Sequence, residues 1–565
     1  MMYPCLLSKL LIITIIVTII IVFQSIIVCA HDLLDVPLSD PLYQDAYDFI
    51  DRMVAQRFVK GVVKNTRPYS RGEVVEILNQ VKQNQVKLSR IEQRRLERLL
   101  SLLSIEKDEV STPALTGRDV VNSGQDAFLE AKGNQYHFTL DVEAGEEVVS
   151  RKISDSEGGL GYITMLRPTV LGRVYRNFAF CSDLKFYYLS GEHFEDIPKT
   201  EARSVQADLG ATTAATTTAY ALFKAPWFGL LLGKDRLHWG PGRHGALLVS
   251  DNPLPMNMVK LIAHYPSGSI QRQKGPQIKF HAFTGTLGSG ISRKYLSGHR
   301  VEMNVRDRIN WGIAETIVFA NRFETIYMNP LQIYTVTELP VKVIRGEGLE
   351  SPDNVLISGD FDLLLKNLSV YGELMIDDFQ PNYGWRSYRH WGSKFGLLFG
   401  LYYINPPLPP FFKGGSEGGF PDSEFRLEYA FINQYAYTHD NNTNYTHFDS
   451  VIGHWIGSDA DVLWVNLKHW FTGDFHASVS FELKRHGEGN MNRPHPQDAP
   501  FEEEWELISG ITESISSLSL SLSYTSVGRF LTEFAYTLSR AKNVDNQLNR
   551  NATEHQLVLR GQYRF

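Results

Sequence analysis

The chain has 565 residues, of which 56 are Lys or Arg and 63 are Asp or Glu, so its formal net charge is −7. This mild acidity comes without a clustered basic stripe. Without such a stripe the chain lacks the surface that neutralises phosphates in a nucleic-acid-binding protein, so nucleic acid is not an expected partner. Length alone permits several domains, but one large unit can absorb most of the chain.

Residues 1–30 have the composition of a signal peptide. Lys9 supplies the positive charge, residues 10–23 are apolar apart from two threonines, and Ala30 ends a Val-Cys-Ala sequence that suits a signal peptidase. We expect cleavage after Ala30, which removes one Lys and no acid and changes the formal charge from −7 to −8. An uncleaved membrane anchor is the alternative, because the apolar stretch approaches the ~20 residues of a spanning helix.

Cysteine usage agrees with export. Cys5 and Cys29 lie in the segment expected to be removed, which leaves Cys181 without an internal disulfide partner. Bulky Val28 disfavours a lipid anchor at Cys29, since a lipobox requires a small residue there. After residue 30 no apolar stretch approaches ~18 residues, so any membrane-spanning part of the mature chain is expected to consist of strands.

Residues 31–104 are expected to form a periplasmic helical domain of three short amphipathic helices. Asp40 before Pro41 predicts the first start, and Ser70 with Glu73, like Ser89 with Glu92, predicts a capping box. The apolar stripes that follow are Tyr43, Tyr47, Ile50 and Val54, then Val74, Ile77, Leu78 and Val81, then Leu96, Leu99, Leu100 and Leu103. A structural bundle or plug is the favoured role, with partner binding as the alternative.

Residues 105–134 are polar and are expected to form a linker, whereas residues 135–565 alternate apolar and polar side chains. In the clearest segment, 517–524, three leucines and a tyrosine alternate with four serines. Segments of about ten residues suit a tilted strand that crosses a bilayer, which needs ~9–11 residues, better than the ~5–6-residue strands of a soluble sandwich. The apolar row is then expected to face lipid and the polar row an enclosed lumen.

The connections between candidate strands alternate between long and short when counted back from Phe565, as in bacterial outer-membrane barrels. The connection at residues 405–423 is an exception, because it is long although it falls on the expected periplasmic side, where turns are short. This indicates either a missed strand or an unusual loop. Allowing ~10 residues per strand, residues 136–565 predict about 16–20 strands, with 18 as the preferred even number. The predicted fold class is mainly β: a large antiparallel transmembrane β-barrel with an N-terminal α-helical bundle.

Four segments resemble the capsule assembly proteins of the Wzi type. They are residues 35–38, 66–73, 229–253 and 371–378, and the most specific part is the Trp-Gly-Pro-Gly sequence that begins at Trp239. The resemblance covers nearly the whole mature chain. It implies an eighteen-stranded outer-membrane barrel, a helical bundle at its periplasmic end, binding of capsular or extracellular polysaccharide, and no enzymatic activity.

The expected function is therefore a non-enzymatic, lectin-like role in capsule or exopolysaccharide assembly or attachment at the outer membrane of a Gram-negative cell. The expected partners are that polysaccharide and outer-membrane lipid, with other polysaccharide-export components as further candidates. No cofactor and no catalytic residue is assigned. An outer-membrane porin or transporter is the first alternative, and an outer-membrane hydrolase is less favoured.

Candidate glycan contacts lie in residues 382–391, an external loop by the alternation of the connections. They are Trp385, Arg386, Tyr388, Arg389 and Trp391. Aromatic faces suit the apolar side of a sugar ring, and arginines suit acidic groups. An aromatic girdle or loop packing inside the barrel mouth is the alternative. His454 and Trp455, in the next external loop, are weaker candidates.

The family motif is expected to be structural; its residues are Arg236, Trp239, Gly240, Pro241 and Gly242, with Asp377 and Asp378 further on. A phosphate-binding loop is disfavoured because the Gly-Lys-Ser/Thr ending of a P-loop is absent. Its glycines permit positive φ, and Arg236 is expected to pair with Asp235 in the lumen. A cation site is the alternative for the two aspartates, but such neighbours at a strand end more often face solvent or arginines, and no metal site is assigned.

Overall fold

A computed structural model describes much of the chain. The described residues are 33–38, 40–103, 128–133, 135–154, 158–175, 177–192, 202–206, 211–265, 276–288, 293–337, 353–378, 393–405, 421–439, 443–491, 507–526 and 529–565. The expected signal peptide, residues 105–127 of the expected linker and the candidate glycan loop at 382–391 lie outside them.

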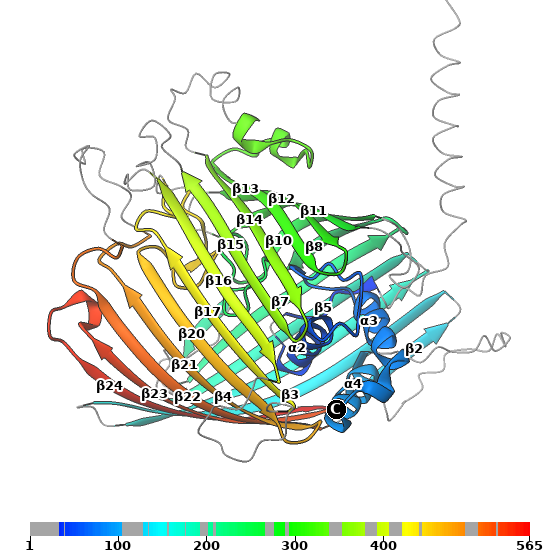
Figure 1. Cartoon of the computed structure of the whole chain (residues 1–565), viewed down its shortest axis with the longest axis horizontal. Helices are drawn as coiled ribbons and strands as arrows, with labels where there is room; N and C mark the ends of the chain where they lie inside the picture. The colour runs from blue at the N-terminus through cyan, green and yellow to red at the C-terminus, as the bar shows by residue number, and fades with distance from the viewer. Residues whose placement is uncertain are drawn as a thin grey trace, which may run out of the picture.

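Within the described residues, eighteen strands close into one antiparallel barrel, as the sequence predicts (Figure 1). Around the ring they are β3 (Tyr136–Ile153), β4 (Gly159–Val174), β5 (Phe178–Gly191), β7 (Ala211–Lys224), β8 (Phe228–Asp235), β10 (Met256–Tyr265), β11 (Gln277–Leu287), β12 (Lys294–Val305), β13 (Ile309–Ala320), β14 (Asn354–Leu365), β15 (Leu368–Asp378), β16 (Lys394–Ile404), β17 (Ser423–Ile432), β20 (Ala460–Trp470), β21 (Phe475–His486), β22 (Glu513–Ser526), β23 (Phe530–Lys542) and β24 (Ala552–Arg564). Pairing of β24 with β3 closes the ring.

The two faces of the barrel wall differ in polarity. On β12, Arg300 and Glu302 are buried inside, whereas Val301 between them is exposed on the outer surface. On β13 the outward Ile313 is 55% exposed and its neighbour Ala314 only 1%. The apolar side chains therefore face mainly outward and the polar ones inward. This is the reverse of a soluble barrel and suits a lipid environment.

Several short strands lie outside the main ring. β2 (Leu129–Gly133), within the expected linker, pairs with β3. β6 (Ala202–Gln206) pairs with residues 211–215, the first part of β7. β1 (Thr66–Arg67) pairs with β9 (His238–Trp239), and β18 (Thr446–His447) pairs with β19 (Ser450–Val451). β1 belongs to the N-terminal domain, and β9 follows a strand of the barrel wall.

The long connection between β16 and β17 contains no barrel strand that was missed. These two strands are direct antiparallel neighbours, with Leu397 opposite Phe431, so no strand was missed between them. Asn405 and Asp422, at the two ends of the connection, both contact the N-terminal helices. The two ends of the connection therefore lie on the helical side of the barrel.

Three α-helices form the N-terminal domain, as expected: α2 (Pro41–Ala55), α3 (Arg71–Gln83) and α4 (Arg90–Leu103). Asp40 caps α2 by accepting from the Leu42 amide at 3.0 Å. Both predicted capping boxes form, at Ser70 with Glu73 and at Ser89 with Glu92. The chain also has short 3₁₀ helices, η2 (Gln85–Lys87), η5 (Thr325–Met328) and η7 (Val544–Asn546). Among the described residues, no helix combines the length and hydropathy needed to cross a membrane.

The helices gather at the end of the barrel where the C-terminus lies (Figure 1). They contact the short turns of that end: the Asn367 amide donates to the Ala55 carbonyl, and Asp307 accepts from the Gly61 amide. Leu364 and Leu531, at the ends of two strands, join the apolar core of the helical domain. The domain thus covers one end of the lumen.

Candidate functional site

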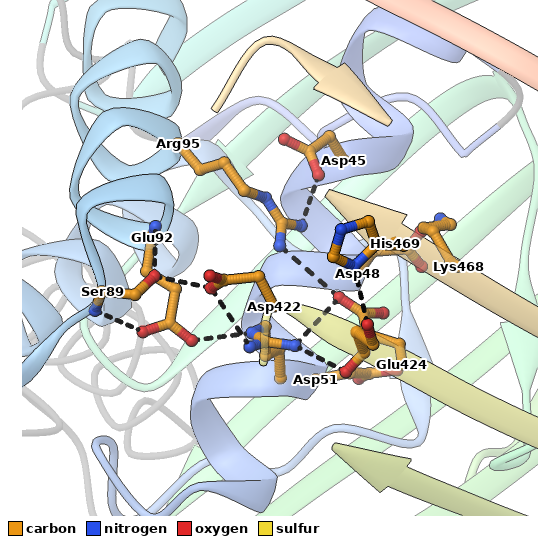
Figure 2. Close-up of polar contacts among 12 residues, drawn as sticks. Asp45, Asp48, Asp51, Ser89, Glu92, Arg95, Asp422, Glu424, Lys468 and His469 are labelled. Atoms are coloured by element: carbon orange, nitrogen blue, oxygen red, sulfur yellow. Dashed lines mark hydrogen bonds and ion pairs between the residues drawn. The ribbon is translucent and has the colours of Figure 1, made fainter. Parts of the chain in front are cut away.

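An acidic face of α2 binds basic side chains that line the lumen. Asp45, Asp48 and Asp51 follow one another at intervals of three residues, so they share one side of the helix. Lys468 of β20 donates to Asp48 at 2.7 Å. Arg243, from the connection between β8 and β10, lies 2.5 Å from Asp51. These charge-assisted contacts hold α2 inside the barrel. Figure 2 shows the three aspartates of α2 together with Lys468.

Asp45 joins α2 to α4 and to the wall. It accepts from Arg95 at 2.6 Å and also pairs with Arg98. Burial raises the pKa of Asp45, but the two guanidinium groups outweigh burial and lower it to about 2. The Arg95 guanidinium also lies 3.9 Å from the ring centre of Trp470, the last residue of β20. A cation–π contact therefore adds to the ion pairs at this joint.

The capping box of α4 also fixes the domain to the barrel. Glu92, which closes the box, accepts from Arg52 of α2 at 2.8 Å. The Ser89 hydroxyl donates to Asp422, beside β17, at 2.6 Å, and Arg52 donates to the Ser423 carbonyl at 3.2 Å. The capping box thus both begins α4 and attaches it to the barrel wall (Figure 2).

Residues 236–255, which we call the first inserted segment, run into the lumen and carry the family motif. Trp239 is buried and packs edge-on against Phe283, with ring centres 5.3 Å apart. The Gly240 amide donates to the Asn65 carbonyl at 2.8 Å, and Pro241 and Gly242 are buried beside it. The Trp-Gly-Pro-Gly sequence therefore joins the helical domain to the wall at the centre of the barrel.

Two wall carboxylates bind the backbone of the first inserted segment. Glu373 accepts from the amides of Leu247 and Leu248, at 3.0 and 3.2 Å. Glu428 accepts from the amides of Arg243 and His244, at 2.7 and 2.8 Å. These bonds satisfy buried backbone groups that have no strand partner.

Asp235 and Arg236, which were expected to pair with each other, contact other groups as well. Asp235 accepts from Lys260 of β10 at 3.1 Å, and Lys260 also binds Asp35. The Arg236 guanidinium donates to the carbonyl oxygens of Asp251 and Pro253, at 2.8 and 2.5 Å. Arg236 follows the last residue of β8, and its side chain bonds the turn that comes after it.

Asp377 and Asp378 have different surroundings. Asp377 is buried and accepts from the Tyr437 amide at 2.7 Å. Asp378 lies opposite Lys394 beyond a register shift in the pairing of β15 with β16. Within the described residues, no group of three or more His, Cys, Asp or Glu side chains is placed to hold a metal ion.

Residues 433–439 and 443–459 form a second inserted segment, which packs on the first. The Tyr437 hydroxyl donates to the Leu247 carbonyl at 2.5 Å, and the Ser250 hydroxyl donates to the Gly453 carbonyl at 2.6 Å. The Trp455 indole donates to the His244 carbonyl at 2.7 Å, while His454 is fully buried. The weaker glycan candidates, His454 and Trp455, are thus used in packing.

The lumen is therefore filled on one side and less so on the other. On the β12–β14 wall the side chains of Arg300 and Asp360 are 1% and 0% exposed. On the β24–β3 wall, Arg560 and Glu147 form a 2.8 Å ion pair with side chains 33% and 20% exposed. The helical domain and the two inserted segments seal the first wall but leave the second partly accessible to solvent.

Residues 173–556 match the family described as capsule assembly protein Wzi, which is more than half of the chain. The chain belongs to the Wzi family. One solved structure, Wzi of Escherichia coli, has a TM-score of 0.54 at 13% identity and covers 93% of this chain and 99% of its own. It is described as an outer-membrane protein involved in group 1 capsule assembly and as a carbohydrate-binding β-barrel.

OpdK of Pseudomonas aeruginosa, solved with vanillate, is a more distant match, with a TM-score of 0.40 and 10% identity over 75% of this chain and 99% of its own. No curated protein matches the chain. The family match and the fold confirm the resemblance seen in the sequence, including the helical bundle and the eighteen strands.

Sequence reasoning missed both inserted segments as lumenal elements. The available signal was the apolar run Ala246, Leu247, Leu248 and Val249 inside a presumed connection, because such a run is rarely left in solvent. The main glycan candidates, Trp385, Arg386, Tyr388, Arg389 and Trp391, lie outside the described residues.

Proposed function

We propose that this Wzi-family chain is a non-enzymatic outer-membrane protein that binds capsular or extracellular polysaccharide at the cell surface and assists its assembly or attachment. The observation that supports this most is the obstructed lumen, which is filled along one wall and covered at one end by the helical domain. Three separate parts of the chain occupy it, and they bind one another through contacts such as that of the Gly240 amide with the Asn65 carbonyl. A porin requires an open lumen, so a surface-binding role fits this arrangement better.

The decisive experiment is deletion of the gene in the native host, followed by measurement of cell-attached and released polysaccharide. We expect polysaccharide to shift from the attached to the released fraction, and a plasmid copy to restore attachment. Unchanged attachment after deletion would contradict the proposal. Other polysaccharide-export components are proposed partners, to be sought by cross-linking in cells that retain the protein.

The loop at 382–391 is the proposed main glycan contact. We expect the variant W385A/R386A/W391A to reduce binding of the host polysaccharide without loss of the folded barrel, since aromatic stacking and bidentate arginine contacts are both removed. Trp227 lies 55% exposed in the turn at the helical end of the barrel, so W227A is the matched aromatic control. Equal binding by the two variants would remove the loop from the proposal.

Export through a cleaved signal peptide is part of the same proposal. We expect the mature protein, extracted from outer membranes, to begin at His31, the residue after Ala30. N-terminal sequencing measures this directly. A protein that retains residues 1–30 would instead support the membrane-anchor alternative.

A further inference from the structure

One stretch of the lumenal wall carries hydroxyl groups that neither the helical domain nor the inserted segments bury. On β22 the inward row contains Ser517, Ser519 and Ser521, all half-buried. They face inward because pairing through β21 places them level with Trp464 and Lys468 of β20, which contact lumenal elements. We call the inward side chains Ser478, Ser480, Ser517, Ser519, Ser521, Thr537 and Ser539 the hydroxyl wall.

Solvent reaches the hydroxyl wall away from the helical domain. Towards the helical end the same inward rows become buried, with Ser523 at 9% exposure, Gln562 at 6% and Leu531 at 3%. Leu531 packs into the core of the helical domain. Farther from the helices the rows are half-buried, and the connection between β23 and β24 (residues 543–551) is largely exposed rather than folded over them. The wall is therefore closed at one end and accessible from the other.

The hydroxyl groups form cross-strand pairs with unused capacity. Ser517 and Ser539 lie 2.9 Å apart, and Ser519 and Thr537 lie 2.8 Å apart. Each hydroxyl has one donor and two acceptor lone pairs, so a pair bonded to itself can still bond a ligand. Together the strands present a row of donors and acceptors of the kind that sugar hydroxyls match.

The charged side chains named beside the wall are paired, and with two arginines against three glutamates they carry a small net negative charge. Arg560 pairs with Glu147 and Glu533, at 2.8 and 3.1 Å, and Arg151 pairs with Glu554 at 2.7 Å. Their side chains are all partly exposed, yet each cation has an anion beside it. A surface of paired charges with an excess of carboxylates does not favour a polyanion, so hydrogen bonding is the recognition chemistry that its hydroxyl groups offer.

We propose that the hydroxyl wall is a second glycan-binding surface, inside the mouth of the barrel, which takes an uncharged, hydroxyl-rich segment of the polysaccharide. This inference rests on the proposed function and deepens it. The segment enters from the end away from the helices and stops where the helical domain covers the wall.

The test compares two isosteric double variants of the full mature protein in detergent micelles. S517V/S519V and S517T/S519T differ only in carrying methyl groups or hydroxyls at the same positions. The probe is the cell-surface polysaccharide purified from the producing strain, and the readout is its Kd. We expect S517V/S519V to bind about tenfold more weakly than the wild type, and S517T/S519T to bind within about twofold of it, because two hydrogen bonds are lost in the first and kept in the second.

The outcomes separate the two proposals. If the wild type does not bind the polysaccharide, the proposed function fails. If the wild type binds and both double variants match it, or both weaken alike, the hydroxyl wall is not a binding surface, while the proposed function stands. A second pair on β21, S478V/S480V against S478T/S480T, repeats the comparison should the β22 variants not fold, and it must give the same difference for the inference to hold.

Discussion

Gly240 occupies a position that only glycine fits. Its φ is +127°, and a Cβ built there would lie 2.7 Å from the Glu373 carboxylate, which binds the backbone of the first inserted segment. We expect G240A to destabilise the protein by about 1–3 kcal/mol, since the substitution combines backbone strain with displacement of a buried carboxylate. Urea unfolding of the protein in micelles measures the change.

Gly359 of β14 provides the control for that measurement. A Cβ there would meet nothing within 4 Å, and its backbone is that of an ordinary strand. G359A is therefore expected to change the free energy of unfolding by less than about 0.5 kcal/mol. Equal effects of the two substitutions would show that the Gly240 conformation has no special role.

Asp45 predicts a pH dependence. Its folded pKa of about 2 is below its ordinary value of 3.8, so its contribution to stability is present above about pH 4 and is lost as the pH falls towards 2. We expect D45N to lower the free energy of unfolding by about 2 kcal/mol at pH 7, and the difference from the wild type to shrink between pH 4 and pH 2. Trp470, beside Arg95, offers a fluorescence signal for the unfolding curves.

A difference between D45N and the wild type that stayed constant from pH 7 to pH 2 would contradict this assignment. E97Q is the control, because Glu97 lies on the same domain with its side chain 72% exposed. It is expected to match the wild type at every pH.

At the residue scale, local chemistry was predictable and long-range pairing was not. The capping boxes at Ser70 and Ser89 depend only on residues three apart, and both were predicted correctly. The partner of Asp235 was not, because Lys260 lies on another strand and reaches it only through the register of β8 with β10. Adjacency in the sequence therefore did not identify the partner of Asp235.

At the element scale, the apolar part of the outward row around Ile313 should not accept an arginine. Ile313 lies near the middle of β13 and is 55% exposed on the outer face. We expect I313R to destabilise the barrel by about 2–4 kcal/mol in a phospholipid bilayer, because the guanidinium is placed in hydrocarbon. Denaturant titration in vesicles measures the change. V86R, at a 91% exposed site on η2, should have almost no effect, and equal losses would argue against a lipid-facing row.

The strands could be predicted because the alternation of apolar and polar residues is visible in the sequence of each strand. The two inserted segments could not be predicted. β22, β23 and β24 match the segments expected from alternation closely. The two inserted segments follow no period of two or of 3.6, since their backbone groups are satisfied by wall carboxylates such as Glu373 and Glu428. Only the assembled barrel brings those partners together.

At the scale of the whole molecule, the filled lumen predicts a protein that does not conduct. We expect the wild type to be silent in single-channel recording. D48N/D51N should produce intermittent openings, because Arg243 and Lys468 lose their buried carboxylates, and breaking such pairs costs about 3–5 kcal/mol. The E97Q control should stay silent. Large steady currents from the wild type would instead favour the porin alternative.

The overall architecture was thus predictable, but the state of the lumen was not. Alternation, connection lengths and the family segments together indicate a barrel with a helical bundle, yet none of them says which lumenal side chains meet water. The Arg300 side chain is 1% exposed and the Arg560 side chain 33%. This contrast arises because the helical domain and the two inserted segments pack against one wall and not the other. The hydroxyl wall could therefore be recognised only in the folded molecule.

The seam between β24 and β3 has a consequence for biosynthesis. Arg151 and Glu554 meet across it although they are 403 residues apart in the chain. The first strand of the ring must therefore wait, without its final neighbour, until translation and export of nearly the whole polypeptide are finished. A product truncated before residue 552 would keep two unpaired strand edges, which makes premature termination a route to aggregation rather than to a smaller working pore-former or receptor.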